Sequence, residues 1–200
     1  MEFQELTDYI GFLNRFTHVK RVVKIPGEKD FENDSEHSYQ LAMVSWYISE
    51  KLALGLKKGL ILEYALAHDL VEVYAGDTDP HRSPPEFIAT KEEREKDALL
   101  KIKDAYPGFH TLHRAIENYE ALADDEAKFV YLLDKILPII NTHLSGDSYY
   151  KDRGVSYNRW KEWLESKQSQ AKFNDKKFQA LLKKVILYFK NVERGFFREV

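Results

Sequence analysis

The chain has 200 residues, of which 44% are hydrophobic, 32% charged and 14% aromatic, with a formal net charge of −3. This composition indicates a globular protein and excludes disordered or collagen-like chains, since there are only 9 Gly and 6 Pro. The absence of Cys excludes disulfides, thiolate metal sites and Cys nucleophiles, and the slightly negative charge gives no general reason to expect nucleic acid as a partner.

A cytoplasmic protein without a membrane partner is the default expectation. The first five residues, Met1 to Glu5, are acidic and lack the basic and then apolar order of a signal peptide. No apolar run approaches the roughly 20 residues that a helix needs to cross a bilayer.

Apolar residues recur at helical spacing along most of the chain. Residues 2–17 form the first predicted helix, with apolar residues at steps of three and four. Pro26-Gly27 is a turn signal, and Asn33-Asp34-Ser35 offers caps for a second helix at about 36–54. A third helix is predicted from about Lys57 to Tyr74, followed by a loop over 76–85. Only Val22 to Ile25 alternates like a strand, and this segment is too short to predict one.

The same periodicity continues in the second half of the chain. Helices are predicted at about 87–105, 109–121, 125–144, 155–170 and 175–195. No internal repeat or linker interrupts the pattern. The sequence therefore predicts one all-α domain over residues 1–200, a compact bundle of about seven or eight helices.

The third predicted helix carries ionisable residues on its apolar face. His68 and Glu72 lie one turn apart on this face, and Asp69 lies about 100° round the helix from His68. Burying such charges costs several kcal/mol per uncompensated ion, and a divalent cation would remove that cost. The alternative is an ion cluster at a helix end.

Two further positions have the same character. His37 lies in step with the apolar residues Leu41 and Val44 of the second helix, where a hydrogen-bonded core histidine is the alternative to a metal ligand. Asp134 aligns with apolar residues of the 125–144 helix, where a surface carboxylate beside Lys135 is the alternative. Pro138 lacks the N–H that would bond the carbonyl of Asp134, which strengthens the case for a special site.

His37, His68, Asp69 and Asp134 thus fall on three predicted helices, each at an inward position. Neutral imidazoles with carboxylates suit Mn²⁺, Fe²⁺, Co²⁺, Ni²⁺ or Zn²⁺ and, less well, Mg²⁺. The pattern predicts one divalent metal ion.

The order of these residues resembles the HD-domain metal-dependent phosphohydrolases. The resemblance rests on Ser-Glu-His37-Ser, on His68-Asp69-Leu-Val-Glu72 followed by Gly-Asp77, and on Leu-Leu-Asp134-Lys. It spans about residues 15–140 and is closest to the single-domain branch that includes bacterial 5'-deoxynucleotidases. The helices at about 155–195 add nothing specific to it.

The resemblance implies a role for each matching residue. His37, His68, Asp69 and Asp134 would hold the metal. Glu72 would act as the acid or base for the attacking water, and Asp77 would support the leaving nucleoside oxygen or the sugar. Arg21 would grip the phosphate, although Val22-Val23 follow it where the family commonly has an aromatic residue. The resemblance also implies a homodimer.

The resemblance implies a phosphatase that acts on nucleoside 5'-monophosphates, with the 2'-deoxy forms as candidate preferred substrates, and chemistry from the residues alone agrees with the hydrolysis of a phosphate monoester. A metal neutralises the dianionic ester, Arg21 can bind phosphate bidentately, and Glu72 can take a proton from water. The alternative for Arg21 is an exposed cation at a helix end, and the alternative for Glu72 is a support for His68. The alternatives for the whole protein are a hydrolase of nucleoside polyphosphates or cyclic dinucleotides and a non-catalytic helical module stapled by the metal.

Other residues carry weaker hypotheses. His81 and Arg82 follow Asp77 and could touch substrate, but a solvated loop is favoured. Trp160 and Trp163 are expected in the core or in a subunit contact.

Overall fold

The computed structural model describes residues 2–81 and 83–199 of the chain. Eight of the described helices have ten or more residues, which confirms the prediction of an all-α fold with seven or eight helices. They are α1 (Phe3–Phe16), α2 (Asp34–Leu52), α3 (Lys58–Ala67), α6 (Lys91–Ala105), α7 (His110–Glu120), α8 (Asp125–Ser145), α10 (Tyr157–Ala171) and α11 (Lys176–Asn191). Four short helices lie between or after them, namely α4 (Glu72–Ala75), α5 (Pro85–Ala89), α9 (Tyr149–Asp152) and α12 (Glu193–Phe196).

A small β-hairpin precedes α2. Strand β1 (Lys20–Lys24) pairs antiparallel with β2 (Phe31–Asn33), and the pairing is irregular between Lys20 and Lys24. The alternating segment at Val22 was too short to predict a strand, because a strand's stability comes from its pairing partner and not from its own residues. The hairpin positions Arg21 on β1 and Glu32 on β2.

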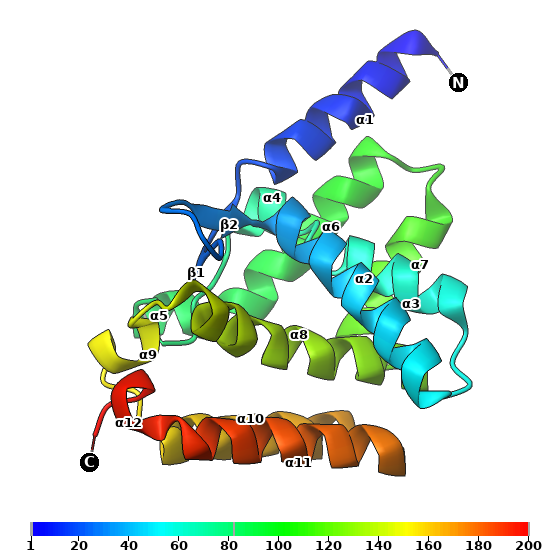
Figure 1. Cartoon of the computed structure of the whole chain (residues 1–200). Coiled ribbons are helices and arrows are strands. Elements are labelled where there is room, and N and C mark those ends of the chain that lie inside the picture. Colours follow the sequence, from blue (N-terminus) through cyan, green and yellow to red (C-terminus); the bar gives the residue numbers. More distant parts are fainter. Residues whose placement is uncertain (1, 82, 200) are drawn as a thin grey trace.

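Helix α8 occupies the centre of the fold (Figure 1) and has more buried residues than any other described helix. Helices α2, α3 and α7 and the hairpin strand β1 contact it, and α10 packs along it as well, with α11 beside α10. The helix continues through Pro138 to Ser145. Its buried apolar residues are Ala127, Phe129, Val130, Leu132, Leu133, Ile136, Leu137 and Ile139.

Helix α1 projects from one end of the molecule (Figure 1), and its apolar stripe is largely exposed. Phe12 and Phe16 are buried against the core, whereas Phe3 and Ile10 keep 78% and 47% of their surface exposed. No described helix is long and apolar enough to cross a membrane.

Candidate metal centre

A capping box at the start of α2 fixes the position of His37. The side-chain oxygen of Asn33 accepts hydrogen bonds from the backbone N–H groups of Ser35 and Glu36, and the Glu36 carboxylate accepts one from the N–H of Asn33. The predicted cap is confirmed, and the helix begins at Asp34. His37 follows in the first turn and is fully buried.

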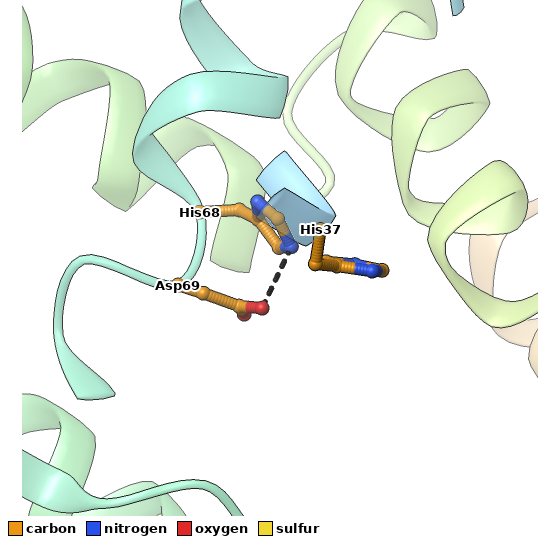
Figure 2. Close-up of side chains that lie close together, drawn as sticks. All are labelled: His37, His68 and Asp69. Carbon is orange, nitrogen blue, oxygen red and sulfur yellow. Dashed lines mark ion pairs between the residues drawn. The ribbon is translucent and has the colours of Figure 1, made fainter. Parts of the chain in front are cut away.

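His68 and Asp69 lie where α3 ends, so the expectation of one continuous helix to Tyr74 is wrong. Helix α3 ends at Ala67, and a turn leads to α4, which begins at Glu72. Successive side chains of a continuous helix point about 100° apart. The chain instead turns here and brings Nε2 of His68 to 3.0 Å from Oδ2 of Asp69 (Figure 2).

Asp134 on α8 lies close to both histidines. Its Oδ1 lies 3.0 Å from Nε2 of His37 and 3.8 Å from Nε2 of His68. Its Oδ2 accepts hydrogen bonds from the Tyr119 hydroxyl at 3.1 Å and from the Lys135 ammonium at 2.6 Å. One carboxylate oxygen is therefore held by donors while the other faces the imidazoles.

The donor set fits a divalent cation. Nδ1 of His68 lies 3.0 Å from the Ala65 carbonyl, which can only accept, so Nδ1 carries the proton and Nε2 faces Asp69. Nε2 of His68 is buried, and its 3.0 Å approach to Oδ2 of Asp69 lacks the geometry of a hydrogen bond, as do its approaches to the other described residues. Such an atom is costly to leave without a partner. His37, His68 and Asp69 each offer a ligand atom within 4.8 Å of the others, and this group can hold a metal ion.

The electric field at the His68 imidazole also favours positive charge. Burial would lower the pKa of His68, but Asp69 and Asp134 outweigh burial and raise it to about 10. Burial would raise the pKa of both carboxyl groups. His68 nevertheless holds the pKa of Asp69 below its usual range, and Lys135 does the same for Asp134. The site therefore keeps both carboxylates ionised.

Glu72 belongs to a second acidic group that shares Asp69. Asp34, Asp69 and Glu72 each have a ligand-type oxygen within 4.8 Å of the others. Burial and repulsion by Asp69 raise the pKa of Glu72 well above its ordinary value, and they raise that of Asp34 to about 7. Oε2 of Glu72 is buried and has no hydrogen-bond partner among the described residues. A buried carboxyl group with a raised pKa can exchange protons during a reaction.

Arg21 is surrounded by carboxylates. Its Nη1 donates to Asp69 at 2.7 Å and to Asp34 at 3.2 Å, and its Nε lies 3.3 Å from Glu32. No hydrogen bond joins its Nη2 to any residue that the structure describes. The alternative of an exposed cation at a helix end is wrong, because Arg21 lies on a strand with only 13% of its side chain exposed.

Glu32 supports the site from behind His37. One of its carboxylate oxygens lies 3.4 Å from Nδ1 of His37, and the other accepts a hydrogen bond from the Asn141 amide at 3.1 Å. Carboxylates in this position commonly orient a ligating imidazole.

A cavity of about 360 Å³ opens beside these residues. Asp69, Glu72, Asp77 and Asp134 line it, as does Arg21, so the acidic residues predicted from the sequence are brought together. Burial raises the pKa of Asp77. The two histidines do not line the cavity and lie behind the carboxylates.

Several residues of the site were not predicted. Tyr119 and Glu32 carried no signal, because a tyrosine on an amphipathic helix and an acid in a polar segment match ordinary core and surface residues. Trp163 was expected in the core or in a subunit contact; it packs partly buried against the core and also lines the cavity, and Trp160 is fully buried as expected. His81 lines the cavity too, and Arg82 lies outside the described residues.

Comparison with known proteins gives a consistent family. The model of the HD domain family matches residues 13–177. The 5'-deoxynucleotidase HDDC2 of Danio rerio is 29% identical over 185 residues, covering 92% of this chain and 84% of the relative. The Homo sapiens protein of the same name is 28% identical over 176 residues, covering 87% of this chain and 78% of the relative.

Two solved structures share the fold. A predicted metal-dependent phosphohydrolase from Magnetospirillum magnetotacticum MS-1 aligns with a TM-score of 0.77 at 22% identity, covering 98% of this chain and 99% of its own. A protein from Pyrococcus horikoshii OT3 aligns with a TM-score of 0.64 at 22% identity, covering 90% and 97%. The predicted HD-domain helical fold is confirmed.

Proposed function

Because the chain belongs to the HD domain family, we propose that it is a metal-dependent phosphohydrolase that releases phosphate from nucleoside 5'-monophosphates. The observation that carries this proposal is the buried group of His37, His68 and Asp69 beside a cavity lined by further acids. The names of the Danio rerio and Homo sapiens relatives support the nucleotide substrate and a preference for the 2'-deoxy form.

His37, His68, Asp69 and Asp134 would hold one divalent ion. When bound, such an ion neutralises phosphate charge and favours the ionisation of water, which is the chemistry that a dianionic ester needs. The nitrogen and carboxylate donors suit Mn²⁺, Fe²⁺, Co²⁺, Ni²⁺ or Zn²⁺, with Mg²⁺ less suitable.

Glu72 and Asp77 would handle the protons. In the reaction a water oxygen bonds to phosphorus while the bond from phosphorus to the nucleoside 5'-oxygen breaks. Glu72 accepts a proton from the attacking water. Asp77, whose pKa is raised by burial, supports the leaving oxygen, which must gain a proton. The products are the nucleoside and inorganic phosphate.

Arg21 would contact the phosphate through Nη2 while its Nη1 keeps Asp69 and Asp34 in place. A guanidinium can do both, because it carries five N–H donors in a planar fork. This division of labour makes Arg21 both an orienting residue for Asp69 and a substrate contact.

The experiment that tests the proposal is a hydrolysis assay on a panel of substrates with Mn²⁺, Co²⁺ or Mg²⁺. The panel contains ribo- and deoxyribonucleoside monophosphates, a nucleoside tetraphosphate and a cyclic dinucleotide. Inorganic phosphate and the nucleotide products are both measured, because opening a cyclic dinucleotide releases no inorganic phosphate. Phosphate release from monophosphates alone supports the proposal, and hydrolysis of the other substrates alone supports a polyphosphate or cyclic-dinucleotide hydrolase. No hydrolysis of any substrate, together with one bound metal per chain, supports a metal-stapled binding module.

A homodimer stays a prediction. Helix α1 exposes Phe3 and Ile10, and α2 exposes Tyr39 and Tyr47, each with 66% of its surface accessible. Exposed apolar surface of this kind often marks a protein contact. The molar mass in solution tests the homodimer: a mass of two chains supports it, and a mass of one chain contradicts it.

A further inference from the structure

One face of α10 reaches the cavity, although this helix lies outside the motif-bearing part of the sequence. Trp163, Lys167 and Gln170 all line the cavity and follow one another at steps of four and three residues. That spacing puts them on one side of the helix. Gln170 accepts a hydrogen bond from the Tyr131 hydroxyl of α8 at 3.0 Å, which ties this face to the helix that carries Asp134.

Trp163 belongs to an aromatic part of the cavity wall. Its ring lies 6.1 Å from the ring of His81, and His81 in turn lies 6.0 Å from Tyr150. All three side chains line the cavity. Trp163 and His81 are half-buried, so the indole is not enclosed by the core as its neighbour Trp160 is. A partly open aromatic wall of this kind suits a flat, apolar-faced ligand group.

Lys167 adds positive charge to the cavity, beside Lys135 and Lys91. Burial and the neighbouring charges of Lys135 and Lys91 lower its pKa. Lys135 bonds Asp134 directly, and Lys91 pairs with Glu95 at 3.2 Å. Lys167 has no ion-pair partner within 4.0 Å among the described residues, so its ammonium group is available to an anionic ligand.

The two residues follow one another along α10 in the order of the parts of a nucleotide. Four residues of helix separate Trp163 from Lys167, which is a rise of about 6 Å along α10. Trp163, beside His81, lies at one end of this span, and Lys167, beside Lys135 and Lys91, lies at the other. A nucleoside 5'-monophosphate has the same arrangement, with a planar base at one end and a phosphate at the other.

We propose that α10 forms the recognition wall for the substrate, with Trp163 stacking on the nucleobase and Lys167 contacting the phosphate. The proposal rests on the proposed function, which supplies the substrate class. Base stacking on an aromatic side chain tolerates every base, because each base has a π-face. The wall therefore recognises that a base is present and does not select which one.

The test compares two ligands that differ only by the base. Binding of 2'-deoxyadenosine 5'-monophosphate and of 2-deoxyribose 5-phosphate is measured by calorimetry in Glu72→Gln protein with Mg²⁺, so that turnover does not consume the ligand. Trp163→Ala in this background should weaken nucleotide binding about tenfold or more and leave deoxyribose phosphate binding unchanged. Trp163→Phe should retain most of the affinity, because a phenyl ring still stacks.

Lys167→Gln should weaken both ligands by a similar factor and reduce the dependence of binding on salt, since it removes a charge that faces the phosphate. Matched controls are Trp46→Ala and Lys183→Gln, which change an exposed tryptophan on α2 and an exposed lysine on α11. Neither control should alter the binding of either ligand. Circular dichroism melting checks that each variant is folded.

The proposal is overturned if folded Trp163→Ala binds the nucleotide like the parent, or if it loses both ligands equally. The proposed contact between Lys167 and the phosphate is overturned if Lys167→Gln leaves the affinities for both ligands unchanged. The proposed function fails separately, if the enzyme with intact Glu72 releases no phosphate while base-dependent binding persists. That result would leave the α10 wall standing as a nucleotide-binding site.

Discussion

Replacing Glu72 by Gln separates proton transfer from metal binding. Glutamine has nearly the same shape, but its neutral amide cannot accept a proton from water at neutral pH. A positioned acid or base contributes on the order of 10²- to 10⁴-fold to turnover, so kcat should fall by that factor, or about 2.7 to 5.5 kcal/mol in activation free energy. Metal content should stay at about one ion per chain, because Glu72 is not among the predicted ligands.

The structure also predicts the effect of this change on stability. Glu72 keeps only 4% of its surface exposed, and repulsion by Asp69, Asp34 and Asp77 is a cause of its raised pKa. A neutral amide removes that repulsion while filling the same space. The unfolding temperature of Glu72→Gln should therefore equal or exceed that of the parent.

The assay measures kcat for phosphate release from a deoxynucleoside monophosphate at saturating Mn²⁺, together with metal content by mass spectrometry and unfolding by circular dichroism. A variant that turns over at the parental rate would refute the assignment of Glu72 as the proton acceptor. A variant that loses its metal would make Glu72 a ligand or an essential support for one.

Three further outcomes follow from the contacts of the site. Arg21→Lys should lower kcat/KM for monophosphates about tenfold or more, because a lysine cannot both orient Asp69 and bind phosphate; an unchanged kcat/KM would remove Arg21 from substrate binding. Tyr119→Phe should weaken metal affinity about tenfold, measured by calorimetry, because Asp134 loses a hydrogen bond; unchanged affinity would contradict this support. After treatment with a chelator, the unfolding temperature should fall as the pH rises from 6.5 toward about 10. The charged His68 stabilises the fold fully below its ordinary pKa of 6.5 and loses its proton as the pH approaches the raised value. Added Mn²⁺ should flatten this dependence, and a flat profile without metal would contradict the raised pKa.

The convergence of His37, His68 and Asp134 was predictable because each interrupts an apolar helical stripe. An inward-facing ionisable residue needs a partner, and three such positions on three helices make a shared site the simplest solution. The same logic identified Asp69 and Glu72, although their placement depends on the turn between α3 and α4, which the sequence does not indicate. No Gly or Pro marks the end of α3 at Ala67, so the periodicity suggested a longer helix.

Residues that act through tertiary contacts were not predictable in this way. Glu32 and Asp34 lie in a polar segment that resembles a solvated loop, and only the hairpin turns them toward Arg21. Trp163 has the helical spacing of a core residue. Its exposure to the cavity depends on how α10 packs along α8, and a single sequence contains no direct signal for that packing.

The cluster of His37, His68, Asp69 and Asp134 is proposed to hold one divalent ion that phosphate release requires. The direct measurement titrates Mn²⁺ into chelator-treated protein while following phosphate release from 2'-deoxyadenosine 5'-monophosphate, with Asp69→Ala as the paired variant. We expect that activity rises from near zero and saturates at about one ion per chain, and that Asp69→Ala neither binds the ion tightly nor gains activity. Activity that is independent of added metal, or an Asp69→Ala variant that binds metal and turns over like the parent, would contradict it.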